Sequence, residues 1–252
     1  MTPSHPNIPP REGHPSGYLV QCLHVYKQYG REGEVFRDAT LLVRHEDFLF
    51  VTGPSGSGKS TLLKMIFGME PFDRGTILIG GRKLQDITRK EIPFFRRRIG
   101  LVFQDSRLLL HRSVFENVAI PLEAAGKEHF FIRKKVYQLL RFVGMEQKMG
   151  VPCLHLSEAE RQKVAIARAV ANDPVLMLAD EPTGNLDTDA AQSVLELLGS
   201  VQARGVTVIL ATHDPALQEA VPGARAVRIA GGRIAEDILW PLAAELVNGN
   251  SA

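Results

Sequence analysis

The sequence is poor in the features that mark secreted and membrane-spanning proteins. Its 252 residues include only two cysteines, Cys22 and Cys153, which are too few for a disulfide framework and are typical of a reducing cytoplasm. The first ten residues lack the apolar segment of a secretory signal, and no uninterrupted apolar run approaches the roughly 20 residues that span a bilayer. We therefore expect a soluble protein that reaches a membrane only through a partner.

An excess of charge is missing as well. The chain has 30 Lys and Arg against 28 Asp and Glu, a formal net charge of +2, which gives no electrostatic case for nucleic acid as a partner. The basic clusters at 96–98 and 133–135 are then interpreted as solvated helix faces rather than binding patches. With 44% hydrophobic residues, the chain can bury the core of one large α/β domain or of a domain with a subdomain.

Apolar periodicity divides the chain into strands and helices. Strand-like segments occupy residues 18–27, 35–43, 48–51, 75–81, 99–103, 175–179, 206–211 and 226–229, and a helical pattern dominates 113–172 and 190–203. Strands that alternate with helices predict a mostly parallel sheet with its chemistry at the carboxyl ends of the strands. We expect a disordered tail at 1–17, one domain at 18–232 with a helical subdomain at about 105–172, and a second tail at 233–252.

One segment matches the phosphate-binding pattern G-x-x-x-x-G-K-[ST] between a strand-like run and a helical stretch. It comprises Gly53, Pro54, Ser55, Gly56, Ser57, Gly58, Lys59, Ser60 and Thr61. The glycines allow the backbone to wrap around phosphates, so that N–H groups and the positive end of the helix face the negative charge. Lys59 would reach the β- and γ-phosphates of a nucleoside triphosphate, and the Ser60 hydroxyl would bind Mg²⁺.

A second motif ends the apolar strand at 175–179 with two carboxylates, Asp180 and Glu181. By themselves they could be two solvated acids at a strand end. Beside a phosphate loop, Asp180 is expected to hold the metal, directly or through water. Glu181 is then placed to polarise the water that attacks the γ-phosphate.

The order of these motifs resembles that of the ABC-type ATPases over roughly residues 18–232. The series is the phosphate loop, Gln104, Leu156-Ser157, Asp180-Glu181, Asn185-Leu186-Asp187 and His213. Phrases at 92–100, 102–105 and 116–122 resemble one group most, the bacterial cell-division ATP-binding proteins of the FtsE type. The phrase at 179–187 is shared with lipoprotein-release and macrolide-export ATPases.

The resemblance implies roles for four further residues. Tyr29 would stack on the adenine, with Tyr26 as the rival aromatic. Gln104 would sense the metal and the γ-phosphate and pass that state to the helical region after it. His213 would contact the γ-phosphate and orient the attacking water, although a lone His-Asp pair is more often a turn. Asp187 would contact a second subunit.

The chain departs from the family at the signature, where a second subunit normally contributes Leu-Ser-Gly-Gly followed by Gln or Glu. Here the segment reads Leu156-Ser157-Glu158-Ala159-Glu160, so Ser157 is present and both glycines are gone. Ser157 and Glu160 have the spacing of a helix capping box, which predicts a sound helix start. Glu158, however, adds a negative charge near the approaching γ-phosphate. We predict weak ATP-driven closure and slow hydrolysis.

The resemblance implies a P-loop α/β core with an antiparallel β portion near the N-terminus and a helical subdomain. It implies a homodimer that sandwiches two Mg-ATP, each Ser157 completing the other copy's site, at the cytoplasmic face of the inner membrane. The partner would be an integral-membrane FtsX-like subunit, and the output would be control of peptidoglycan hydrolysis in cell division. Two alternatives stay open: the ATPase of a lipoprotein-release or macrolide-type exporter, and an ATP-dependent scaffold with little turnover.

Overall fold

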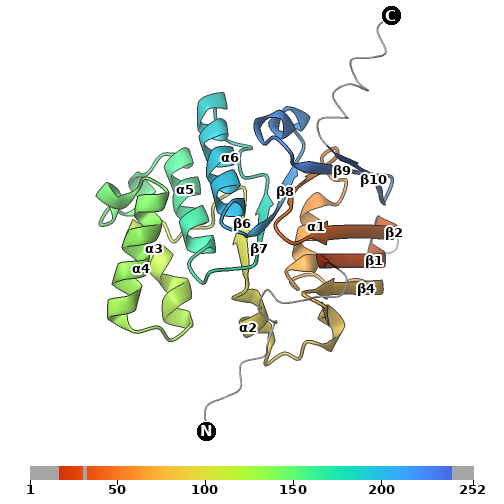
Figure 1. Cartoon of the computed structure of the whole chain (residues 1–252), viewed down its shortest axis with the longest axis horizontal. Helices are drawn as coiled ribbons and strands as arrows, with labels where there is room; N and C mark the ends of the chain where they lie inside the picture. Colours follow the sequence, from red (N-terminus) through yellow and green to blue (C-terminus); the bar gives the residue numbers. More distant parts are fainter. Residues whose placement is uncertain (1–16, 31–32, 240–252) are drawn as a thin grey trace, which may run out of the picture.

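The computed structural model describes residues 17–30 and 33–239 (Figure 1). The predicted disorder at 1–17 therefore falls almost wholly outside the described residues, as does the end of the chain from residue 240. The strands are β1 (Tyr18–Tyr29), β2 (Gly33–Arg44), β3 (Phe48–Thr52), β4 (Arg74–Ile79), β5 (Arg82–Lys83), β6 (Ile99–Val102), β7 (Leu176–Asp180), β8 (Thr207–Thr212), β9 (Arg225–Ala230) and β10 (Arg233–Leu239).

The helices are α1 (Lys59–Ile66), α2 (Ile92–Arg96), α3 (Val114–Ala124), α4 (His129–Phe142), α5 (Glu158–Ala169) and α6 (Thr188–Gln202). Short 3-10 turns are η1 (Leu84–Asp86), η2 (Glu146–Lys148), η3 (Cys153–His155) and η4 (Pro215–Ala220). The five residues of α2 were not predicted as a helix, because so short a segment shows no helical period. Among the helices of the described ranges, none has the length and apolar character needed to cross a membrane.

The strands form two sheets. Four of them pair antiparallel in the order β2-β1-β4-β5. The other six have the order β10-β9-β3-β8-β7-β6, in which β9, β3, β8, β7 and β6 run parallel and β10 is antiparallel to β9. The P-loop α/β core and the antiparallel portion near the N-terminus are thus confirmed.

The central strand β3 is buried on both faces, and its alternating side chains join two hydrophobic clusters. Phe48 and Phe50 pack with residues of α3 to α6, whereas Leu49 and Val51 pack with α1 and the antiparallel sheet. Because neighbouring side chains on a strand point to opposite faces, this pattern puts α1 between the two sheets. Figure 1 shows α3, α4 and α5 gathered on the other side of the six-stranded sheet, in agreement with the predicted helical subdomain.

The expected tail from residue 233 begins instead as a strand. Arg233–Leu239 form β10, in which Ile234 pairs with Ile229 of β9. Gly231 and Gly232 connect the two strands with φ values of 56° and 73°, the left-handed conformation that a two-residue hairpin turn requires. The domain therefore continues past residue 232, and the Gly-Gly pair was the signal for this hairpin.

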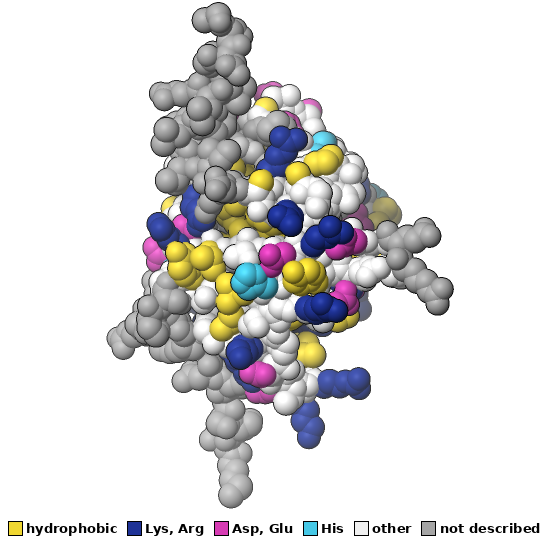
Figure 2. Space-filling model, turned by 90° about the vertical axis from the view of Figure 1, so that its right-hand side faces the viewer, with side chains coloured by type: hydrophobic (Ala, Val, Ile, Leu, Met, Phe, Trp, Pro, Cys, Tyr) yellow, Lys and Arg dark blue, Asp and Glu magenta, His cyan; other side chains and the backbone are white. Residues whose placement is uncertain are grey.

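Basic and acidic side chains are interspersed on the side of the molecule that carries the antiparallel sheet (Figure 2). Exposed polar pairs lie there, such as the ion pair of Arg37 with Glu34 and the hydrogen bond between Nδ1 of His24 and Oδ1 of Asp38 at 2.7 Å. Charges of both signs that alternate over a surface produce little net field, in keeping with the formal net charge of +2.

Candidate active site

The phosphate loop connects β3 to α1 and depends on glycine at two positions. A Cβ at Gly53 would lie 2.7 Å from the carbonyl oxygen of Ile229, and one at Gly58 would lie 2.7 Å from Cγ1 of Val35. Gly58 is also the N-cap of α1, with φ 106° and without any side-chain capping bond. The first amides of α1 therefore have no side-chain acceptor, which is how a helix start suits an anion.

Two buried polar side chains of this loop, those of Lys59 and Ser57, have surroundings that suit a phosphate ligand. Lys59 is 6% exposed, and its Nζ donates to the carbonyl oxygens of Gly53 at 2.9 Å and Pro54 at 3.2 Å. The Oγ of Ser57 is buried and has no hydrogen-bond partner among the described groups. Since buried polar groups are normally satisfied, a cation on backbone carbonyls beside a spare hydroxyl fits a loop built around phosphate oxygens.

The two predicted carboxylates face this loop from β7. Ser60 donates from Oγ to Oδ1 of Asp180 at 2.8 Å, and Oε1 of Glu181 lies 3.4 Å from Nζ of Lys59. Burial raises the pKa of Asp180 above its ordinary value, and the hydrogen bond from Ser60 opposes that shift. The hydroxyl and carboxylate are oxygen ligands of the kind that Mg²⁺ prefers.

Glu181 and His213 form a pair at the ends of β7 and β8. The Oε2 atom of Glu181 accepts from the backbone N–H of His213 at 3.2 Å and lies 3.0 Å from its Nδ1. Glu181 has φ 48°, an uncommon value for a residue other than glycine, and its N–H still donates to the carbonyl of Ala211 at 2.9 Å. The backbone thus turns sharply while the carboxylate is held between a cation and an imidazole. A cavity of about 360 Å³ opens beside the pair.

Gln104 follows β6 and lies against the loop after Glu181. A Cβ at Gly184 would come within 3.0 Å of Nε2 of Gln104. Sequence reasoning assigned Gln104 but missed Gly184, although the phrase at 179–187 was itself conspicuous. The structure therefore brings Lys59, Ser60, Asp180, Glu181 and His213 together through hydrogen bonds and ion pairs, with Gln104 at the same edge of the sheet.

Tyr29 lies near this group of residues without joining it by a direct contact. It ends β1 and pairs with Gly33, two residues before Val35, whose side chain covers Gly58. The ring is 44% exposed, and Nζ of Lys27 lies 4.5 Å from its centroid. One aromatic face is thus partly occupied while much of the ring stays accessible.

Ser157 belongs to a different part of the molecule. It is the N-cap of α5 and forms the predicted capping box, accepting from the N–H of Glu160 at 3.2 Å while Glu160 accepts from its N–H at 3.1 Å. Because α5 packs on the face of the six-stranded sheet opposite α1, a single chain does not bring Ser157 to its own phosphate loop.

Comparison with known proteins places this geometry in a family. Residues 36–184 match the family described as ABC transporter. The cell division ATP-binding protein FtsE of Bacillus subtilis is 40% identical over 219 residues, which cover 87% of this chain and 96% of the relative. FtsE of Escherichia coli strain K12 is 43% identical over 196 residues, covering 78% and 88% respectively. This chain belongs to the FtsE family of ABC proteins.

Solved structures agree with the FtsE assignment. The ATP-binding cassette MJ0796, in a dimeric post-hydrolysis state bound to ADP and Pi, superposes with a TM-score of 0.79 at 30% identity, covering 88% of this chain and 98% of that one. The protein cbiO1 of Clostridium perfringens, part of an ABC transporter complex, gives a TM-score of 0.83 at 26% identity, covering 93% and 92%. The family resemblance that the sequence motifs indicated is confirmed.

Proposed function

We propose that this FtsE-family chain is the ATP-binding and ATP-hydrolysing subunit of an FtsX-like membrane complex that acts in cell division and in the control of peptidoglycan hydrolysis. The observation that carries the proposal is the meeting of Lys59 and Ser60 from the phosphate loop with Asp180 and Glu181 from β7. A cation, a hydroxyl and two carboxylates in this arrangement suit phosphoryl transfer, which depends on positioning and charge stabilisation.

Each residue then has a definite task when ATP binds. Lys59 exchanges its loop carbonyls for oxygens of the β- and γ-phosphates, and Gly53, Pro54, Ser55, Gly56, Ser57, Gly58 and Thr61 complete the cradle. Tyr29 offers its exposed ring to the adenine. Ser60, Asp180 and Gln104 would hold Mg²⁺, which neutralises phosphate charge when bound.

Water activation falls to the pair at the ends of β7 and β8. Glu181 accepts a proton from the attacking water, and its pairing with His213 at 3.0 Å fixes the carboxylate in place. His213 would contact the γ-phosphate and orient the attacking water. The strained backbone at Glu181 supports this assignment, since such strain is concentrated at functional sites.

We further propose that two copies form a homodimer in which Ser157 and Asp187 of each complete the other's site. The dimeric state of the MJ0796 cassette supports this arrangement, and so does the position of Ser157 away from its own phosphate loop. The complex would lie peripherally on the cytoplasmic face of the inner membrane, held by the FtsX-like subunit. We propose no nucleic-acid partner.

A second candidate function is an ATP-dependent scaffold with little turnover, and one observation favours it. The carboxylate of Glu158, paired with Arg161 at 3.3 Å, occupies the position where the family has glycine. The exporter alternative shares all of the catalytic residues and differs only in the membrane protein that the chain binds.

Steady-state ATP hydrolysis tests the proposal. The purified chain would be assayed with and without its co-purified membrane subunit, with Glu181→Gln as the catalytic blank and Lys59→Ala as the binding blank. We expect slow turnover above the Glu181→Gln rate, raised by the membrane subunit. Turnover equal to that of Glu181→Gln, with ATP still bound, would favour the ATP-dependent scaffold over the hydrolysing subunit. An exporter's membrane protein in the purified complex would favour the exporter alternative over a role in cell division.

A further inference from the structure

The helix that begins at the signature also holds the backbone on both sides of Gln104. From the middle of α5, Nε2 of Gln162 donates to the carbonyl oxygen of Phe103 at 3.2 Å. From its end, Arg168 donates from Nη2 to the carbonyl of Ser106 at 2.6 Å and from Nη1 to the carbonyl of Arg107 at 2.8 Å. The residue before Gln104 and the two residues after Asp105 are therefore fastened to the same helix.

The segment that Arg168 holds is strained. Ser106 and Arg107 have φ values of 50° and 48°, so two consecutive residues other than glycine adopt the left-handed conformation. Each such residue is unfavourable and persists only when its surroundings hold it in place. Ser106 is 2% exposed although its neighbours Asp105 and Arg107 are exposed, so this turn is held to the protein through its buried serine.

The guanidinium of Arg168 is committed to this backbone. None of the ion pairs found in the described part of the chain includes Arg168, and burial lowers the pKa of its guanidinium. Its two donors thus meet two consecutive carbonyl oxygens in the forked geometry that arginine provides and lysine does not.

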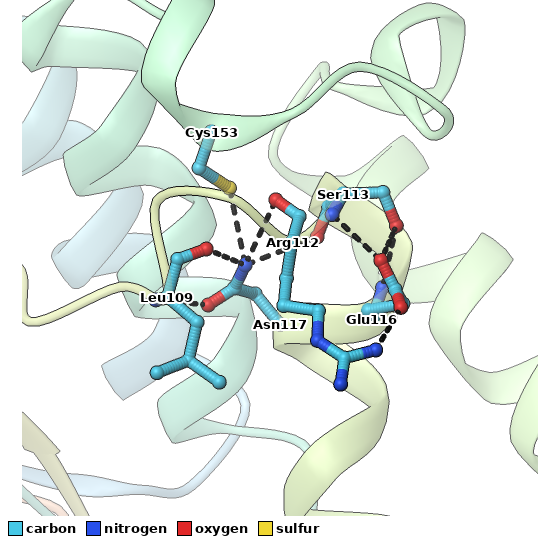
Figure 3. Close-up of polar contacts among 6 residues, drawn as sticks. All are labelled: Leu109, Arg112, Ser113, Glu116, Asn117 and Cys153. Carbon is cyan, nitrogen blue, oxygen red and sulfur yellow. Dashed lines mark hydrogen bonds and ion pairs between the residues drawn. The ribbon is translucent and has the colours of Figure 1, made fainter.

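A second anchor holds the far end of the same segment (Figure 3). The fully buried Asn117 accepts from the N–H of Leu109 at 2.8 Å and donates to the carbonyls of Leu109 and Ser113 at 3.0 Å and to Sγ of Cys153 at 3.3 Å. The N–H of Cys153 in turn donates to the carbonyl of Arg112 at 3.0 Å. Cys153 begins η3, which ends two residues before Ser157.

The family resemblance already implies that Gln104 passes its state to the helical region after it. We infer that Arg168 is the positioning residue for this transfer, because it ties the segment after Gln104 to the signature helix that begins at Ser157. This inference rests on the proposed function, in which Gln104 serves the chain's own nucleotide and Ser157 serves the other copy's. Coupling between two sites requires an element with which both make contact, and α5 with its two anchors is that element.

Three variants test the inference. Arg168→Met removes both hydrogen bonds, Arg168→Lys keeps the charge with a poorer geometry, and Arg96→Met is the matched control. Arg96 also donates to two consecutive carbonyls, those of Phe67 at 3.4 Å and Gly68 at 2.7 Å, but these belong to the segment after α1 and not to the segment after Gln104. We expect Arg168→Met to lower kcat at least ten-fold with KM for ATP within two-fold, Arg168→Lys to recover part of the rate, and Arg96→Met to leave both constants within two-fold.

A rescue separates positioning from general stability. Ser106→Gly relieves the left-handed strain, so in the Arg168→Met background it should restore part of kcat, whereas Ser106→Gly should add nothing to Arg96→Met. Equal kcat values for Arg168→Met and Arg96→Met, or a rise in KM with unchanged kcat, would overturn the inference. Should Arg168→Met fail to fold, Arg168→Lys with and without Ser106→Gly supplies the same comparison.

Hydrogen exchange distinguishes this inference from the proposed function, because it needs binding rather than turnover. The chain is kept monomeric by dilution, so that no second copy's phosphate reaches Ser157. ATP should then change amide exchange in peptides covering 103–110 and 153–162 of the unaltered protein, but only in 103–110 of Arg168→Met. The same response of both peptides in that variant would refute the coupling. If the unaltered chain hydrolyses ATP no faster than Glu181→Gln, the proposed hydrolysis is refuted. The hydrogen-exchange result would then still decide whether Arg168 couples the two segments.

Discussion

Restoring glycine at the signature should make this chain a faster ATPase. Glu158 and Ala159 are the first two residues of α5, directly after Ser157. The Glu158 side chain is 32% exposed, and its Oε2 lies 3.3 Å from Nη1 of Arg161. A γ-phosphate brought to Ser157 by a second copy would meet this carboxylate, whereas glycines would present only backbone. The double substitution Glu158→Gly with Ala159→Gly removes both the charge and the side chains.

The size of the effect follows from the charges. Two like charges 4 Å apart repel by about 1 kcal/mol in water and by about 4 kcal/mol at an effective dielectric constant of 20. Arg161 offsets part of the repulsion because it already pairs with Glu158, so the lower figure applies. A change of about 1 kcal/mol in the barrier is roughly five-fold in rate. Glycine lowers helix stability by up to about 1 kcal/mol per position relative to alanine, so some loss of stability should accompany the gain in rate.

The assay is steady-state ATP hydrolysis at saturating ATP, together with nucleotide-dependent dimerisation of the Glu181→Gln forms. Glu158→Gln is the matched control, because it removes the charge and keeps the side chain, and it should deliver most of the gain. Arg161→Met should act in the opposite direction by exposing the carboxylate. A double-glycine variant that binds ATP but hydrolyses it at the unaltered rate would refute the electrostatic reasoning.

Three further predictions concern single contacts. Gly184→Ala places a Cβ 3.0 Å from Nε2 of Gln104 and should lower kcat several-fold with little change in ATP affinity, and an unchanged kcat would contradict it. Burial raises the pKa of Asp180, so its ionised carboxylate lowers the stability of the folded protein at pH values above that pKa. In the absence of nucleotide, Asp180→Asn should therefore raise Tm at pH 7, and this gain in Tm should shrink towards pH 4. A gain that is the same at both pH values would contradict the prediction. Ser113→Ala removes the capping box of α3 and should lower the free energy of unfolding by about 1 kcal/mol in urea denaturation, whereas the exposed Lys90→Ala should not.

The phosphate loop and the central strands could be predicted because their signals are local. Leu49 and Val51 are apolar because both faces of β3 are covered, and the glycines that follow are dictated by contacts a Cβ would break. The capping box at Ser157 and Glu160 is equally local, since its four atoms come from one helical turn. Three or four neighbouring residues are enough to determine each of these features.

The hydrogen bonds from α5 to the backbone around Gln104 could not be predicted in that way. Arg168 meets residues about 60 positions earlier in the chain, and nothing in the letters around it distinguishes it from a surface arginine. The left-handed conformation of Ser106 and Arg107 is equally hidden, because neither is a residue type that favours it. Such features exist only once the fold has brought the segments together.

Helix α5 explains why the altered signature can be tolerated. Its start is secured by the capping box, in which Glu160 also forms an ion pair with Lys148, and that box needs Ser157 and Glu160 but neither glycine. Arg168 lies 11 residues after Ser157, about 16 Å along a helix that rises about 1.5 Å per residue, so a helix that does not fray can carry a displacement from one end to the other. In the proposed homodimer, the loss of the glycines should therefore weaken contact with the second copy's phosphate, while the helix that connects Ser157 to the segment after Gln104 stays intact. On this reasoning the chain keeps the connection between Gln104 and Ser157 but loses part of the free energy with which ATP would bring two copies together. We expect this combination in a slow ATPase whose turnover is raised by its membrane partner.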